Sequence, residues 1–217
     1  MPRVVDPDQR KREIIDAVVL TLGEGGFAKF SLKAVAERMG GSITLITHYF
    51  PNRDALMAGL LDQVVEDRNQ VYEKLAEATD PYERVYAALK YFLPDTPENL
   101  ALERARVALA AHLRGDPAVT KFFKVLEPAM RDVFCLALDG VITDPDVEPT
   151  VDILRAWSSG IVLSAVEHPE IWTPRRQRAA LERFLEMIMP QLRGTTAVRS
   201  RATALAARPR SAAKRRA

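Results

Sequence analysis

The chain has 217 residues, of which 47% are apolar and 28% charged, which is typical of a globular protein and excludes a disordered or fibrous one. A single cysteine, Cys135, excludes an internal disulfide framework. No apolar run approaches the roughly 20 residues of a membrane-spanning helix, and the N-terminus has no secretory pattern. We therefore expect a soluble, cytoplasmic protein with no membrane partner.

The net charge of +2 conceals an uneven distribution. Residues 193–217 contain no acidic residue and eight basic ones, which are Arg193, Arg199, Arg201, Arg208, Arg210, Lys214, Arg215 and Arg216. The rest of the chain is therefore net acidic. Such a tail either contacts a polyanion such as DNA or is a solvated terminus without a partner, and its composition predicts disorder in both cases.

Apolar residues recur with helical spacing along the chain, and no strand-like alternation stands out. This pattern predicts an all-α fold of about nine helices. The first helix is expected from about Asp8 to Leu22, with Ile14 and Val18 on one face. The glycines that start at Gly23 are expected to end it.

Two short helices follow around a pair of glycines. Ser31 is a suitable N-cap for the first helix and Ser42 for the second, and Gly40-Gly41 turns the chain between them. Pro51 ends the second helix. Two short helices joined by a tight turn are typical of a helix-turn-helix, whose second helix enters the major groove of DNA.

Capping residues mark the start of the later helices. Asn52 precedes a long helix from Arg53 to about Ala78. Four helices are expected to start where an oxygen-bearing residue precedes proline, at Asp80-Pro81, Thr96-Pro97, Asp116-Pro117 and Thr173-Pro174. The expected helices are 81–93, 97–114, 117–139, 147–168 and 174–189. Pro128 falls inside the third of these, which we expect to kink or break there.

These elements divide the chain into three parts. Residues 1–52 are expected to form a helix-turn-helix DNA-binding domain, residues 53–192 a larger helical domain, and residues 193–217 the basic tail. The helix that starts at Arg53 is shared by the two folded parts, so a movement in one should be felt by the other.

The second short helix has an inward and an outward face. Ile46 and Phe50 are four residues apart and are expected to pack inward. The outward residues are Ser42, Ile43, Thr44, Thr47 and His48. Their methyl, hydroxyl and imidazole groups suit base edges and phosphates, and Lys33 and Arg53 flank them as phosphate contacts. The alternative is a purely structural hairpin whose polar residues are its solvated face.

A wider pattern runs through the same region: Arg12, Ile14, Ile15, Ala17, Gly26, Phe27, Ser31, Val35, Ala36, Gly40, Ser42, Tyr49, Phe50, Arg53 and Leu56. Over about residues 10–60 it resembles the N-terminal domain of TetR-family regulators. The resemblance implies DNA contacts at Ser31, Lys33, Ser42, Ile43, Thr44, Thr47, His48, Tyr49 and Arg53. The run from Ile46 to Phe50 is most similar to the choline-responsive BetI-like branch.

Three positions depart from the family pattern. Gly41 stands where the family usually has an apolar residue. The run Thr44-Leu45-Ile46-Thr47 lacks a tyrosine that commonly contacts phosphate, and Arg53 stands where lysine is more usual. These departures bear on the operator sequence and not on DNA binding itself.

By the same resemblance, residues 53–192 form a ligand-binding and dimerisation domain, with a small-molecule effector in a cavity and a homodimer through the last two long helices. Aromatic and polar residues interleave with apolar ones in the middle helices, as a pocket requires. The candidate ligand-binding residues are Tyr86, Arg106, His112, Phe123, Phe134 and Trp157; the alternative is that the aromatic ones belong to the core. A dimer places two recognition helices about 34 Å apart on a pseudo-palindromic double-stranded DNA operator.

No pattern of metal ligands or catalytic groups stands out. His48, His112 and His168 are widely spaced, and Cys135 has no histidine near it in sequence. We therefore expect no metal, no cofactor and no enzyme activity. The expected function is a ligand-responsive DNA-binding regulator, and specifically a repressor released by a small molecule. The alternatives are a helical ligand carrier or enzyme with a vestigial helix-turn-helix, and a helical adaptor whose tail binds an acidic protein.

Overall fold

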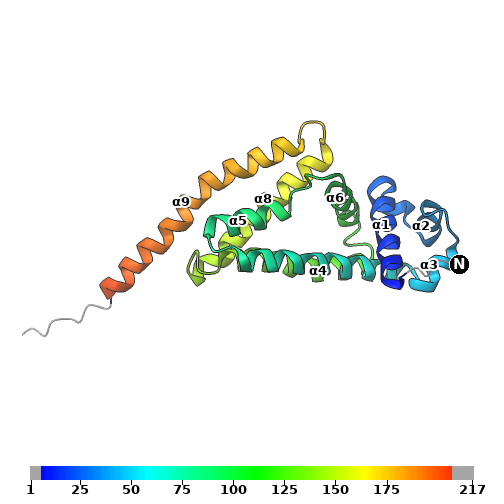
Figure 1. Cartoon of the computed structure of the whole chain (residues 1–217), viewed down its shortest axis with the longest axis horizontal. Helices are drawn as coiled ribbons and strands as arrows, with labels where there is room; N and C mark the ends of the chain where they lie inside the picture. Colours follow the sequence, from blue (N-terminus) through cyan, green and yellow to red (C-terminus); the bar gives the residue numbers. More distant parts are fainter. Residues whose placement is uncertain (1–5, 207–217) are drawn as a thin grey trace, which may run out of the picture.

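A computed structural model describes residues 6–206, with the side chains of these residues except Asp144 and residues 193–206 (Figure 1). Within this range the regular structure is helical throughout, as predicted. The elements are α1 (Pro7–Gly25), the short 3₁₀ helix η1 (Phe27–Lys29), α2 (Leu32–Arg38), α3 (Ile43–Tyr49), α4 (Arg53–Glu77), α5 (Pro81–Tyr91), α6 (Pro97–Ala110), α7 (Pro117–Leu138), α8 (Asp144–Glu167) and α9 (Pro174–Ala206). None of the helices in the described range combines the length and apolar content needed to cross a membrane.

The helices are arranged in two groups joined by one long helix. Figure 1 shows α1, α2 and α3 gathered at one end of the molecule, while α4 runs from this group along the remaining helices. The second half of α9 projects beyond the bundle at the opposite end (Figure 1). The candidate DNA-binding residues on α2 and α3 therefore lie at the opposite end of the molecule from the C-terminal end of α9.

Side-chain caps define the helix starts that the sequence predicts. Asp80, Thr96, Asp116 and Thr173 each accept a hydrogen bond from a backbone N–H in the first turn of the helix that follows. Each cap satisfies one or two of the N–H groups that a helix start leaves unpaired. Asp6 before Pro7 caps α1 in the same way.

Helices α1 and α6 end at other residues than predicted. Helix α1 continues through Gly23 to Gly25 and stops at Gly26, which has a φ of 68°. A Cβ added at Gly23 would lie 3.1 Å from the carbonyl oxygen of Ala101, so this glycine permits a close approach of α6 instead of ending α1. Helix α6 ends at Ala110, before the predicted residue 114, because the chain beyond it forms turns.

Prolines do not interrupt the long helices. Helix α7 is continuous through Pro128, without the break that was one of the two predicted outcomes, and α9 is continuous through Pro190. Both prolines are exposed, so the carbonyl group that loses its helical partner can be hydrated. Because α9 reaches Ala206, it covers part of the segment expected to be a separate tail; residues 207–217 lie outside the described part of the chain.

The buried apolar side chains form two clusters. The first joins α1–α4 to parts of α6 and α7, and it includes Ile14, Ile46 and Leu109. The second lies within the bundle and includes Leu75 and Phe134. Helix α4 takes part in both, since Leu60 belongs to the first cluster and Leu75 to the second. The helix-turn-helix is thus packed on the bundle, because it shares its core with α6 and α7.

The turn between α2 and α3 is closed by backbone hydrogen bonds. The N–H of Gly41 donates to the carbonyl oxygen of Ala36 at 3.0 Å, and the N–H of Gly40 donates to that of Glu37 at 3.1 Å. This pair of bonds is the Schellman motif that commonly ends helices. It requires the left-handed conformation at Gly40, whose φ is 64°.

Replacing Gly40 by alanine should destabilise the protein through the backbone alone, because no atom lies within 4 Å of the added Cβ. The positive φ should lower the free energy of unfolding by about 1 kcal/mol. Urea titration followed by circular dichroism measures this change. Gly115→Ala is the control, since its added Cβ would meet only a carbonyl oxygen at 3.9 Å and its φ is not positive. Equal stability of Gly40→Ala and the wild type would contradict this account.

Candidate nucleic-acid interface and internal cavity

Serine side chains set the starts of both short helices. The Oγ of Ser31 accepts a hydrogen bond from the N–H of Ala34 at 3.1 Å, and the Oγ of Ser42 accepts one from the N–H of Leu45 at 3.3 Å. Both serines are exposed. A capping hydroxyl still has its own proton to donate, so each serine can bond a phosphate oxygen while it caps its helix.

Helix α3 has the two faces that the sequence predicts. Ile46 has no exposed surface and Phe50 is buried, and both belong to the first apolar cluster. On the opposite side Ile43 is 46% exposed, and Thr44 and His48 are also exposed. The burial of one face therefore leaves methyl, hydroxyl and imidazole groups on a continuous outer face.

The remaining predicted contacts on this surface are partly covered. Thr47 and Tyr49 are half-buried, and the hydroxyl of Thr47 donates to the carbonyl oxygen of Thr44 at 3.2 Å. The ring of His48 meets that of Tyr49 edge to face, with centroids 4.9 Å apart. Lys33 on α2 is 74% exposed and lies 3.7 Å from Glu37, a weak surface pair that leaves its ammonium group accessible.

Arg53 occupies a different environment from the one predicted. Its Nη1 donates to Oδ2 of Asp116 at 2.8 Å, and its guanidinium lies 4.1 Å from the ring centroid of Phe27. The side chain is only 32% exposed. Arg53 is therefore a contact between the helix-turn-helix and the bundle as well as a candidate phosphate contact, a role that residue spacing does not reveal because Asp116 is far away in sequence.

A cavity of about 270 Å³ lies inside the bundle, between α4, α6 and α7 and the end of α5. Its lining residues are Leu60, Val64, Asp67, Gln70, Val71, Lys74, Tyr91, Phe92, Leu93, Asn99, Leu102, Glu103, Ala105, Arg106, Leu109, Phe122, Leu126 and Met130. Some of these, such as Leu109, belong to the first apolar cluster and others, such as Phe92, to the second. The cavity thus lies at the seam between the two cores.

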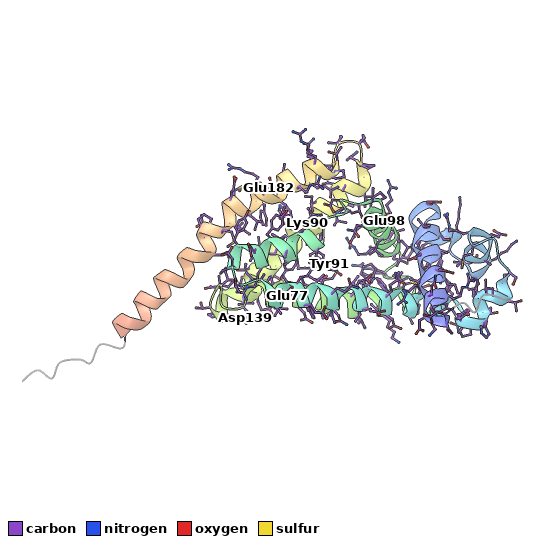
Figure 2. The ribbon with its side chains drawn as sticks, in the orientation of Figure 1. Glu77, Lys90, Tyr91, Glu98, Asp139 and Glu182 are labelled. Atoms are coloured by element: carbon purple, nitrogen blue, oxygen red, sulfur yellow. The ribbon has the colours of Figure 1, made fainter. Side chains whose placement is uncertain are left out.

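Tyr91 lines the cavity from the end of α5 and lies between α4 and α6 (Figure 2). Burial, together with the carboxylates of Asp67 and Glu103, raises the pKa of Tyr91 to about 12. Its hydroxyl therefore remains a hydrogen-bond donor at neutral pH. Glu103 accepts a bond from Nε of Arg106 at 2.5 Å, so these two charges compensate each other.

Asp67 stands at the exposed edge of the cavity. Its partial burial raises the pKa of its carboxyl group, and the neighbouring Glu66 and Asp16 raise it further. No ion pair of Asp67 occurs within the described residues. The cavity therefore combines apolar walls with two charged side chains for which no ion pair occurs within the described residues, Asp67 and Lys74.

Of the six ligand-binding residues expected from the sequence, only Arg106 lines this cavity. Phe134 is fully buried and stacks on Phe92, and Trp157 stacks on Phe184. His112 stacks on Phe27 at 4.4 Å, outside the bundle core. Phe123 packs against the first cluster and Tyr86 against the second. Helical spacing predicts which residues are apolar or inward, but it does not reveal where packing leaves space.

The polar lining residues that sequence reasoning missed are Asp67, Gln70, Lys74, Tyr91, Asn99 and Glu103. Most of them are exposed residues on α4 and α6 that look like an ordinary solvated helix face. Tyr91 is the last residue of α5 and is half-buried. Its approach to Asp67 and Glu103 depends on how α5 packs against α4 and α7.

Helices α8 and α9 present apolar side chains to solvent. The largest exposures are those of Ile153, at 59%, and Met187, at 58%. On the same two helices the rings of Trp157 and Phe184 stack, with centroids 4.6 Å apart and planes 7° from parallel. Other apolar residues of the two helices are buried within the subunit, namely Ile161, Val162, Ala165, Leu181, Leu185 and Met189. We call Ile153, Trp157, Phe184 and Met187 the apolar strip of α8 and α9.

Comparison with known proteins gives consistent relationships. Residues 14–60 match the family described as "Bacterial regulatory proteins, tetR family". Residues 81–190, half of the chain, match the family described as "BetI-type transcriptional repressor, C-terminal". The HTH-type transcriptional regulator BetI of Burkholderia lata is 24% identical over 137 residues, which cover 62% of this chain and 71% of the relative. The BetI of Brucella canis is 32% identical over 93 residues, covering 41% and 46% of the two chains.

Solved structures share the fold. A transcriptional regulator from Rhodococcus sp. Rha1 is similar with a TM-score of 0.71 and 23% identity, over 83% of this chain and 96% of that one. A regulator from Saccharomonospora viridis, crystallised in complex with choline, has a TM-score of 0.70 and 16% identity, over 82% and 96% of the two chains. Both the helix-turn-helix and the bundle are thus accounted for, and the chain belongs to the TetR family of bacterial transcriptional regulators, with a C-terminal domain of the BetI type.

Proposed function

We propose that this regulator is a dimeric repressor that holds a pseudo-palindromic operator with α3 and releases it when a small organic cation fills the cavity. The exposed face of α3, opposite the fully buried Ile46, carries the proposal. In this proposal residues 1–52 bind DNA and residues 53–192 bind the ligand and dimerise, while of the basic segment 193–217 the residues up to Ala206 continue α9.

The DNA contacts divide by the chemistry of each side chain. Ile43, Thr44, Thr47 and His48 are assigned to base edges, because their methyl, hydroxyl and imidazole groups suit thymine methyls and purine acceptors. The hydroxyl and ammonium groups of Ser31, Lys33, Ser42 and Tyr49 are assigned to phosphates. Arg53 is assigned to a phosphate through the part of its guanidinium that Asp116 does not engage.

The effector class follows from the cavity lining. Apolar side chains from α4, α6 and α7 suit the body of the molecule, and the rings of Tyr91 and Phe92 suit an alkylated ammonium group. The carboxylate of Asp67 supplies the opposite charge. A fold relative was crystallised with choline, which is a cation of this kind. We therefore assign the cavity to a small alkylammonium compound.

The dimer is assigned to the apolar strip on α8 and α9. Ile153 and Trp157 are one turn apart on α8, and the stacked Phe184 continues the strip to Met187 on α9. An isologous contact of this strip with its copy would remove these side chains from water. It would also place two α3 helices in the same complex, as a palindromic operator requires.

Substitution of Lys33 by alanine should weaken binding to all DNA sequences alike. The loss of one phosphate contact should reduce the slope of log K against log salt by about 0.9. Fluorescence anisotropy with the DNA upstream of the regulator's own gene, repeated over a salt series, measures this slope. Arg175→Ala on α9 removes an exposed cation far from α3 and should leave the slope unchanged.

By contrast, Thr47→Ala and His48→Ala should change the preference between operator variants, and a uniform loss of affinity for all of them would contradict their base-reading role.

Asp67→Asn should weaken choline binding by roughly tenfold, because the cavity loses the charge opposite the ammonium group. Tyr91→Phe keeps the ring and removes the hydroxyl, so it should have a smaller effect. Isothermal titration calorimetry with choline chloride tests both variants. Asp62→Asn is the matched control, because Asp62 lies on the same helix and does not line the cavity. Failure of choline to bind the wild type, or equal affinity in wild type and Asp67→Asn, would refute the cation assignment.

Ile153→Glu and Met187→Glu should each convert the dimer to a monomer, since an ionised side chain would have to be buried at the interface without a partner. Sedimentation velocity over a concentration series gives the oligomeric state. Leu20→Glu serves as the control, because it places the same charge at an exposed apolar residue on α1, away from the strip. A dimer of unchanged stability in both variants would move the interface elsewhere.

A further inference from the structure

Four side chains meet where the bundle touches the helix-turn-helix. The guanidinium of Arg53, the first residue of α4, lies over the ring of Phe27, and His112, just beyond α6, stacks on the same ring at 4.4 Å with planes 23° apart. Asp116, the N-cap of α7, completes the group through its 2.8 Å bond to Arg53. We call these four residues the joint.

Asp116 is held rigidly to α7. Its Oδ1 accepts the backbone N–H groups of Ala118 at 2.9 Å and Val119 at 3.1 Å, which leaves Oδ2 for Arg53. The bond from Arg53, helped by the two backbone bonds, lowers the pKa of Asp116, so this carboxylate is ionised at neutral pH. Because Oδ1 is bonded to the first turn of α7, the position of Oδ2 follows the start of this helix.

Arg53 depends on that oxygen. Its Nε is buried and has no acceptor among the described residues, and one face of its guanidinium is covered by Phe27. A part-buried guanidinium without a carboxylate would be costly, so the contact constrains where α4 can begin. Arg53 follows α3 by only a short turn. The start of α4 in turn sets the position of α3.

The joint and the cavity are built on the same helices. Leu60 of α4, Leu109 of α6 and Phe122 of α7 line the cavity, while the same three helices begin or end at the joint. Leu60 lies seven residues beyond Arg53, about 10 Å along the helix. A molecule in the cavity that pushes α4 away from α6 and α7 would therefore also displace the residues of the joint, which lie only one to two helical turns away.

We propose that Asp116 is a positioning residue for DNA binding: through Arg53 it sets the angle between α3 and the bundle, and through this contact the occupancy of the cavity changes that angle. The proposal rests on the proposed function of α3 and of the cavity. It assigns the coupling to one ion pair and one stacked ring at the joint, and not to the shared apolar core as a whole.

Asp116→Asn is the discriminating variant. Asparagine still caps α7, because its amide oxygen accepts the same backbone N–H groups, but it carries no charge for Arg53. Asp80→Asn is the matched control: Asp80 also precedes a proline and caps a helix through a 3.2 Å bond from Glu83, and it has no ion pair within the described residues. Both variants lose one carboxylate at a helix start, so only the joint differs between them.

The first measurement needs no DNA. Spin labels on Glu37→Cys in α2 and Lys124→Cys in α7, in a Cys135→Ser background diluted with unlabelled protein, report the distance between the helix-turn-helix and the bundle by pulsed electron resonance. The distribution should be narrow in the wild type and in Asp80→Asn, and about twice as wide in Asp116→Asn. Equal widths in Asp116→Asn and Asp80→Asn would overturn the proposal.

The second measurement tests coupling, with a substitution standing in for a bound effector. Ala105→Leu adds volume to the cavity from α6, and Leu102→Phe is a second such variant if the first lowers the melting temperature. Each should weaken binding to the upstream DNA roughly tenfold in the wild type and in Asp80→Asn, and less than about threefold in Asp116→Asn. An equal loss in all three backgrounds would refute the joint. If the wild type binds no upstream DNA, the proposed function fails, and the spin-label widths alone decide the role of Asp116.

Discussion

The burial of one stripe on α3 is the constraint on which the DNA-binding surface depends. A helix of seven residues is not stable alone. It persists because Ile46 and Phe50 enter the core shared with α1 and because Ser42 caps its first turn. Since these anchors occupy one side, Ile43, Thr44 and His48 are exposed on the other. The face that packs in the core and the face proposed to read DNA therefore belong to the same short helix.

The packing of the helices also produces the cavity. Two apolar clusters form, one around the helix-turn-helix and one inside the bundle, and α4 passes from the first to the second. The cavity lies at the seam between the two clusters. It is lined by Leu109 of the first cluster and by Phe92 of the second. In the proposed coupling, a ligand at this seam displaces α4, α6 and α7, and the joint passes this displacement to α3.

Electrostatics refine this arrangement. Most ion pairs on the surface, such as Lys33 with Glu37, are exposed and contribute little. The pair between Arg53 and Asp116 differs, because it is part-buried, covered by Phe27 and joins the two groups of helices. Within the cavity, Glu103 compensates Arg106 while Asp67 has no ion pair in the described residues. The charges to which we assign a regulatory role are those that packing has partly removed from water.

The sequence by itself determined where these helices start and which face of α3 is buried, because caps and amphipathic spacing act within a few residues: Ser31, Ser42, Asn52 and Asp80 all cap the helices they were expected to cap. Family membership followed from the same short region. Only the tertiary structure decided that Gly23 is a contact with α6, that Tyr91 and Asp67 border a cavity while Phe134 fills the core, and that Asp116 holds Arg53. These outcomes depend on how helices that are distant in sequence pack together, because residue spacing within one helix does not specify its neighbours.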